Sequence, residues 1–130
     1  MIITKEILDE LTGQAKASER QRANLDLRNS ADDQSQRMLN ALEPGTLMPI
    51  HRHKCSSETC LCIRGHFEEY FYDEDGNLTE TIDMMPDGIV LNIEKGRWHS
   101  LKCLESGTVL FEAKDGPYHP LEEDEIYQEL

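Results

Sequence analysis

A short stretch of the chain carries the residue types of a metal centre. It runs from Gly45 to Gly65 as GTLMPIHRHKCSSETCLCIRG and contains His51, His53 and Glu58. Because alternate side chains of an extended strand point to the same face, His51 and His53 can offer their imidazole nitrogens to one point. Glu58 and a later histidine, His99, complete a possible set of three nitrogens and one oxygen, which suits a divalent transition metal.

The chemistry of these four side chains favours a bound cation. Three neutral imidazoles and a carboxylate packed together would be unfavourable without one. We therefore predict one divalent transition metal, with one or two coordination positions left for water or substrate if the site is open. Zinc, iron, nickel, copper and manganese all accept imidazole and carboxylate ligands, so the residues leave the identity of the metal open.

The size and charge of the chain limit its fold and its partners. Its 130 residues are enough for one domain with a hydrophobic core, and its formal net charge of −13 argues against a nucleic acid or an anionic membrane as partner. No run of 18 or more apolar residues and no basic-then-apolar leader occurs, so we expect neither a membrane span nor a secretory signal. The four cysteines are therefore expected to be reduced, with Cys60 and Cys62 as small packing residues of a strand.

The elements that must position the site are predicted to be mostly β. Apolar residues at helical spacing over 4–18, behind Thr4 as a cap, predict one N-terminal helix. The polar segment 19–35 is expected to be an irregular connection. The acidic tail from Leu121 is expected to be either a short closing helix or a solvated end.

Beyond Gln36, short runs rich in β-branched and aromatic residues alternate with turn signals. The runs are 38–42 (which could also be a helical turn), 47–53, 61–64, 67–72, 78–83, 89–93, 100–104 and 108–113. Several short strands at this spacing predict an antiparallel sandwich or barrel. Segments 67–72 and 78–83, on either side of Asp75-Gly76, are the clearest hairpin.

Two glycine-framed motifs resemble those of the cupins, which are double-sheet jelly-roll domains. The first motif matches at Gly45, His51, His53, Glu58 and Gly65, and the second at Gly88, Gly96 and His99. Glu94 stands where cupins usually have proline, and Cys103 where they often have asparagine. The resemblance implies a mostly β cupin double-stranded β-helix with a short N-terminal helix. Within one structural domain it implies an N-terminal helix and arm (1–35) packing on the barrel (36–120), followed by the acidic tail (121–130).

Longer stretches are similar to the WbuC-type cupin metalloproteins, from about Arg20 over nearly the whole remaining chain. These stretches are RQRANLDL, QRMLNALEPGT, GRWHSL and ESGTVLFEAKDGPYHP. Members of that family are found in gene clusters for bacterial O-antigen and other surface polysaccharides. The resemblance implies a metal site and a bacterial cytoplasmic setting, and it suggests a sugar or sugar-nucleotide substrate. We also expect a homodimer.

A metal-dependent isomerase or epimerase of a carbohydrate is the function that the residues and the resemblance favour. The metal would act as a Lewis acid, and Tyr118 or Glu112 would be the acid or base. Glu112 can do this only if it points into the barrel, because on the outer face it would simply be solvated. Two alternatives remain: an iron-dependent dioxygenase of a small polar molecule, and a non-catalytic, metal-assisted sugar-binding module.

Four further residues are candidates for binding a small anionic substrate. Arg20, Arg22 and Asn24 match the arm of the WbuC-type proteins, and two arginines there could clamp a phosphate or carboxylate. The alternative is an exposed linker with ordinary surface charges. Lys114 could bind a substrate anion, or it could belong to a turn shaped by the following Asp-Gly-Pro sequence.

Overall fold

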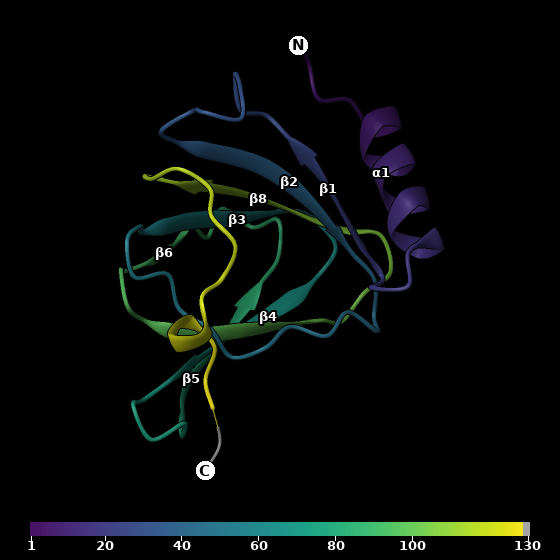
Figure 1. Ribbon diagram of the computed structural model, residues 1–130. Helices are drawn as coiled ribbons and strands as arrows, with labels where there is room; N and C mark the ends of the chain where they lie inside the picture. The colour runs from purple at the N-terminus through teal and green to yellow at the C-terminus, as the bar shows by residue number, and fades with distance from the viewer. Residues whose placement is uncertain (129–130) are drawn as a thin grey trace.

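The protein is built from two antiparallel sheets and one helix, which confirms the mostly β prediction. The computed structural model describes residues 1–128, so the end of the predicted acidic tail, 129–130, lies outside the described residues. In chain order the elements are α1 (Lys5–Ala17), β1 (Arg22–Asp26), β2 (Gln36–Leu42), β3 (Glu58–Arg64), β4 (Phe67–Tyr72), β5 (Leu78–Met84), β6 (Leu91–Ile93), β7 (Trp98–Cys103), β8 (Thr108–Lys114) and the 3-10 helix η1 (Glu123–Glu125). The larger sheet has the strand order β1-β2-β8-β3-β6, and the smaller one has the order β5-β4-β7 (Figure 1).

Helix α1 begins behind the predicted cap and covers the outer face of the larger sheet. The Thr4 hydroxyl accepts a hydrogen bond from the Ile7 backbone N–H at 3.4 Å, which satisfies one of the free donors of the first turn. The apolar stripe of the helix packs on β2 and β8 through Leu8, Leu11 and Ala15 against Leu39, Ala41 and Val109. At 13 residues α1 falls short of a bilayer crossing, and no other helical stretch within residues 1–128 has the length and apolar character for one.

A second apolar cluster fills the space between the two sheets. It consists of Leu42, Cys60, Cys62 and Leu110 from the larger sheet and Phe67, Met84 and Cys103 from the smaller one. Complete burial of a side chain such as Phe67 contributes about 1.5–3 kcal/mol. Cys60 and Cys62 are thus buried packing residues, as predicted, and all four cysteines are free thiols.

Two predictions of local structure are wrong. The polar segment 19–35 contains strand β1, which forms the edge of the larger sheet because Ala23 and Leu25 pack toward α1. Segment 47–53 is not a strand, and within residues 1–128 its only ladder contacts are isolated bridges at His51. The ambiguous segment 38–42, in contrast, is a strand and forms most of β2.

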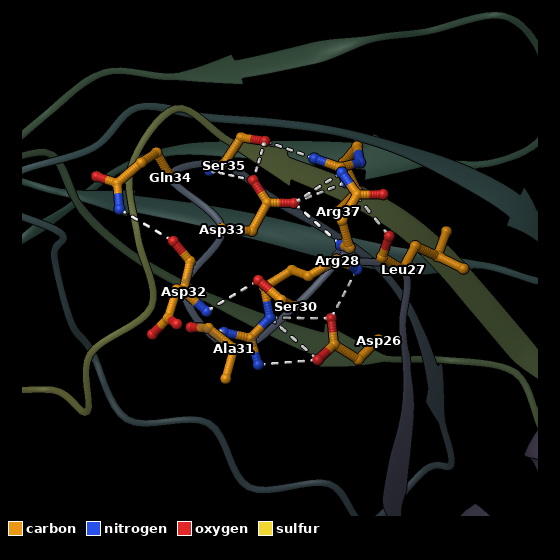
Figure 2. Close-up of polar contacts among 11 residues, drawn as sticks. Asp26, Leu27, Arg28, Ser30, Ala31, Asp32, Asp33, Gln34, Ser35 and Arg37 are labelled. Atoms are coloured by element: carbon orange, nitrogen blue, oxygen red, sulfur yellow. Dashed lines mark hydrogen bonds and ion pairs between the residues drawn. The ribbon is translucent and has the colours of Figure 1, made fainter.

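Short polar contacts hold the connection between β1 and β2 (Figure 2). The Asp26 carboxylate accepts hydrogen bonds from Nε and Nη2 of Arg28, at 3.0 and 2.8 Å. Further along, Asp33 accepts a hydrogen bond from Nη2 of Arg37 at 3.1 Å. This network fixes the guanidinium of Arg28, whose position matters for the mouth of the site described next.

Candidate metal centre

The predicted metal ligands come from three parts of the chain. His51 and His53 lie on the connection between β2 and β3. Glu58 is the first residue of β3, and His99 is the second residue of β7. His51 and His99 exchange two backbone hydrogen bonds, from His51 N to His99 O at 2.9 Å and from His99 N to His51 O at 2.8 Å. This pair of bonds fixes the connection beside β7.

The three imidazoles converge on one point. Each offers a ring nitrogen, and these nitrogens lie within 4.8 Å of one another. Oε2 of Glu58 lies 3.6 Å from Nε2 of His53 and 3.5 Å from Nε2 of His99. The three histidines could therefore hold a metal ion, and Glu58 approaches two of them.

Backbone carbonyls determine which ring nitrogens face the centre. Nδ1 of His51 lies 2.9 Å from the Pro49 carbonyl oxygen, and Nδ1 of His99 lies 2.8 Å from that of Arg97. Because a carbonyl oxygen only accepts, each Nδ1 must carry the hydrogen, and Nε2 of the neutral ring is then a bare acceptor. Nε2 of His99 is buried without a hydrogen-bond partner among residues 1–128. Metal-binding histidines typically use this tautomer, with the second ring N–H donated to a carbonyl or carboxylate.

All three imidazoles are neutral near pH 7. Burial is the main cause, and it lowers the pKa of His51 to about 4 and that of His53 to about 2. Burial also lowers the pKa of His99. Neutral imidazole is the form that coordinates a metal. Because Glu58 approaches two neutral rings, and its oxygen faces the lone pair of His99, these contacts are not ion pairs, and the group fits a cation at its centre.

A cavity of about 270 Å³ between the two sheets contains this cluster. The other residues that the sequence singles out line the same cavity: Arg20, Arg22, Asn24, Glu112, Lys114 and Tyr118. They come from β1 and the residue pair before it, from β8, and from the segment after β8. Residues distant in the sequence thus share one cavity with the candidate ligands.

Glu112 lies on the inner face of β8. The Asn40 side chain donates a hydrogen bond to its carboxyl group, and Nζ of Lys114 lies 3.8 Å from its Oε2. Burial raises the pKa of Glu112 well above its usual value, and the adjacent carboxyl group of Glu58 raises it further. Of the two orientations that the sequence leaves open for Glu112, the inward one is found. Its carboxyl group can hold a proton next to the histidine cluster.

Glu69 is a cavity residue that the sequence analysis missed. It lies in the middle of β4 with only 2% of its surface exposed, and it has no side-chain hydrogen bond within the described part of the chain. Burial, followed by the charges of Glu58 and Glu112, raises its pKa well above the usual value. The alternation of β4 could have indicated that Glu69 is buried, because Glu69 shares a face with the buried residues Phe67 and Phe71.

Tyr118 lies at the mouth of the cavity and is 57% exposed. The Arg28 guanidinium carbon lies 5.6 Å from the centre of the Tyr118 ring, and Asp26 holds that guanidinium in place (Figure 2). In the turn before Tyr118, Asp115 accepts a hydrogen bond from the Ser57 backbone N–H at 2.7 Å. The segment after β8 is therefore tied both to the β1–β2 connection and to the chain just before β3.

Known structures resemble this fold at low sequence identity. KdgF from Halomonas sp. has a TM-score of 0.61 and 14% identity, over 75% of this chain and 82% of that one. The Cnp3 cupin domain of Schizosaccharomyces pombe also has a TM-score of 0.61, with 16% identity over 74% of this chain and 61% of that one. The Bacillus subtilis oxalate decarboxylase, studied for its Mn(II) centres, has a TM-score of 0.59 and 22% identity, over 82% of this chain and 27% of that one. These likenesses show that the chain has the cupin fold.

Sequence comparison gives a family with no assigned activity. No curated protein matches the chain. A family model does match, over residues 3–84, and its description is "Domain of unknown function (DUF6016)". This match extends from the residue before the Thr4 cap through β5, and so includes three of the four candidate ligands. The family model matches well over half of the chain, so the chain belongs to the DUF6016 family.

Proposed function

We propose that this protein is a metal-dependent enzyme that isomerises or epimerises a carbohydrate or sugar nucleotide. In this proposal His51, His53, Glu58 and His99 hold one divalent transition metal. The motifs shared with the WbuC-type cupins support a role in bacterial surface-polysaccharide biosynthesis, in the cytoplasm and as a homodimer.

The bare Nε2 of His99 is the observation that carries the proposal. It is buried, its tautomer is fixed by the Arg97 carbonyl, and Oε2 of Glu58 lies 3.5 Å from it. A buried acceptor without a donor costs about 1–3 kcal/mol, so without a bound cation the cluster would destabilise the fold. Coordination of a cation would satisfy His99 and its neighbours together.

The cavity offers the groups that the proposed reaction requires. A bound divalent cation would polarise a carbonyl or hydroxyl oxygen of the substrate. Glu112, whose raised pKa keeps a proton available, would first give that proton to the substrate carbonyl oxygen, with the Tyr118 hydroxyl as the alternative acid. The Glu112 carboxylate formed in this way would then accept a proton from the adjacent carbon. A proton removed from one carbon is returned to a carbon of the same substrate, so the overall reaction needs no oxidant.

The size and charge of the cavity support a small anionic substrate. Its volume of about 270 Å³ lies just below the roughly 300–1,000 Å³ of sites for drug-sized ligands. This volume favours a single sugar unit inside the cavity, so that any nucleotide portion would lie outside it. Arg20, Arg22 and Lys114 line the same cavity and would bind a carboxylate or phosphate of the substrate.

Metal analysis of protein purified without oxygen tests the proposal, followed by a turnover screen of sugar phosphates and nucleotide sugars. Zinc or manganese at one ion per chain, with anaerobic turnover, supports an isomerase. Iron with consumption of oxygen would assign the protein to the dioxygenases instead. Thermal stabilisation by a sugar without turnover would indicate a binding module, and failure to bind any divalent ion after saturating dialysis rejects the metal centre.

Replacing Arg22 with alanine is expected to weaken anion binding and leave the metal content unchanged. Arg22 lines the cavity and is half-buried, and among residues 1–128 its side chain donates one weak hydrogen bond, from Nη1 to the Met48 sulfur at 3.4 Å. Loss of a charge-assisted hydrogen bond worth about 1.5–3 kcal/mol corresponds to a roughly 10- to 100-fold increase in Kd. Calorimetry with glucose 6-phosphate and glucuronate measures the change.

The matched control for this experiment is Lys102→Ala. It removes one positive charge from an exposed position on β7 that does not line the cavity. An equal loss of affinity in both variants would reduce the role of Arg22 to general charge attraction. Unaltered affinity in Arg22→Ala would remove the clamp from the proposal.

A further inference from the structure

The C-terminal segment 122–127 lies along the connection that carries His51 and His53. The Arg52 backbone N–H donates to the Glu125 carbonyl at 2.9 Å, and the Tyr127 N–H donates to the Ile50 carbonyl at 2.9 Å. His51 itself forms a β-bridge with Ile126. These contacts lie on the side of the connection opposite His99, so His51 is bridged on both sides.

Glu125 is the buried anchor of this segment. Its side chain is fully buried, with 0% exposure. Oε2 accepts a hydrogen bond from the Lys54 backbone N–H at 2.9 Å, and Oε1 accepts one from the Glu122 N–H at 3.0 Å. The two oxygens therefore join the residue after His53 to the turn that contains Glu125.

Contacts at the ends of the segment hold it in place. Nζ of Lys54 lies 2.7 Å from the Asp124 carboxylate. At the other end the Tyr127 ring packs edge-on against Trp98, with centroids 5.4 Å apart. The Arg52 guanidinium also contacts Trp98, with its carbon 4.4 Å from the ring centre. Tyr127 also leaves no room for a Cβ at Gly76, which would lie 2.6 Å from its ring. The segment is thus seated against β7 and the β4–β5 turn.

We propose that residues 122–127 are a positioning strap for the metal centre and that Glu125 is its positioning residue. The connection that carries His51 and His53 belongs to no strand, so no continuous ladder fixes its backbone. The bonds from His99 hold it at His51 only. Glu125 supplies two further attachments, at Arg52 through its carbonyl and at Lys54 through its carboxylate. They flank His53, whose own carbonyl accepts a hydrogen bond from the Gly96 N–H at 2.9 Å.

The strap should raise the affinity of the site for its metal, an inference that rests on the proposed metal centre. A metal site needs its ligands held close to the coordinating geometry before the ion arrives, because freedom in the ligands is lost on binding. Removing a group that orients a metal-ligating side chain typically weakens metal binding by about 10- to 100-fold. Among residues 1–128 no hydrogen bond or ion pair joins the Glu125 side chain to His51, His53 or His99, so Glu125 would act through the backbone of 52–54.

Glu125→Ala in the full chain tests the strap, with Glu123→Ala as the matched control. Glu123 has the same side chain in the same turn, but it is exposed and has no side-chain hydrogen bond within residues 1–128. Titration with Co²⁺, followed by its visible absorption, should show roughly tenfold or greater weakening for Glu125→Ala. Glu123→Ala should titrate like the unaltered protein.

Hydrogen exchange separates the strap from the metal centre. The Lys54 amide loses its acceptor in Glu125→Ala and should exchange faster. The Arg52 amide keeps the Glu125 carbonyl and should exchange faster only because the segment loosens, while the amides of α1 stay unchanged. Unaltered Co²⁺ affinity together with unaltered exchange at Arg52 and Lys54 would overturn the strap. If the unaltered protein binds no Co²⁺, the metal centre fails and the exchange rates still decide the strap. Should Glu125→Ala not fold, Glu125→Gln keeps the volume and one acceptor oxygen, and it should show a smaller change in the same direction.

Discussion

Replacing His99 with alanine is expected to remove most of the bound metal. His99 supplies the most buried of the three imidazoles, and its Nε2 has no hydrogen-bond partner among residues 1–128. Loss of an outer contact to a ligand already weakens metal binding by about 10- to 100-fold, so loss of the ligand itself should cost at least about 100-fold. Elemental analysis after dialysis, and a Co²⁺ titration for the affinity, measure the effect.

His66→Ala is the control for this substitution. His66 is also a histidine near the end of a strand, but its Nε2 lies 2.7 Å from Asp83 and outside the cluster. This variant should keep its metal. Unchanged metal stoichiometry in His99→Ala would reject its role as a ligand and, with it, the three-histidine centre.

The candidate cluster could be predicted because its signal is local. His51, His53 and Glu58 lie within eight residues, and their spacing alone indicates convergence. His99 lies much later in the chain, and it was found from the second glycine-framed motif. Alternation along one strand is the wrong reason for the convergence, since His51 and His53 do not lie on a regular strand. His51 is held by isolated bridges to His99 and Ile126 instead.

The strap could not be predicted, because its contacts are between residues far apart in the sequence. Glu125 and Lys54 are separated by 71 positions, and an acidic tail ordinarily indicates a solvated surface. The buried carboxylate looks the same in the sequence as its exposed neighbours Glu122 and Glu123. What distinguishes it is two backbone donors, which a sequence does not reveal.

Strand β1 and Glu69 differ from the strap, because both lie in segments with the alternation of a strand. In each case a feature of the residues obscures that alternation. In β1, Ala23 and Leu25 alternate with Arg22, Asn24 and Asp26, but only two small or medium apolar residues mark the buried face. In β4, Glu69 occupies a buried position between two phenylalanines. A charged residue at such a position departs from the usual pattern, and departures of this kind concentrate at functional sites.

Gly65→Ala is expected to destabilise the whole domain. Gly65 joins β3 to β4 with φ +87°, where a side chain is strained, and a Cβ there would lie 2.2 Å from Oγ1 and 2.7 Å from the backbone Cα of Thr108. The left-handed conformation costs about 1–2 kcal/mol, and overpacking against a backbone that cannot move costs about 1–3 kcal/mol more. A loss of roughly 3 kcal/mol is a large fraction of the about 5–15 kcal/mol that stabilises a typical domain. Thermal or urea unfolding measures it.

Gly88→Ala separates the two causes of this loss. Gly88 has nearly the same φ, +90°, but a Cβ there would have no atom within 4 Å. It should lose only the conformational part, about 1–2 kcal/mol. Equal losses in the two variants would show that the approach to Thr108 costs nothing. A larger loss for Gly65→Ala would explain why this position of the first motif requires glycine: the turn that follows the Glu58 strand must lie directly on β8, the strand that carries Glu112.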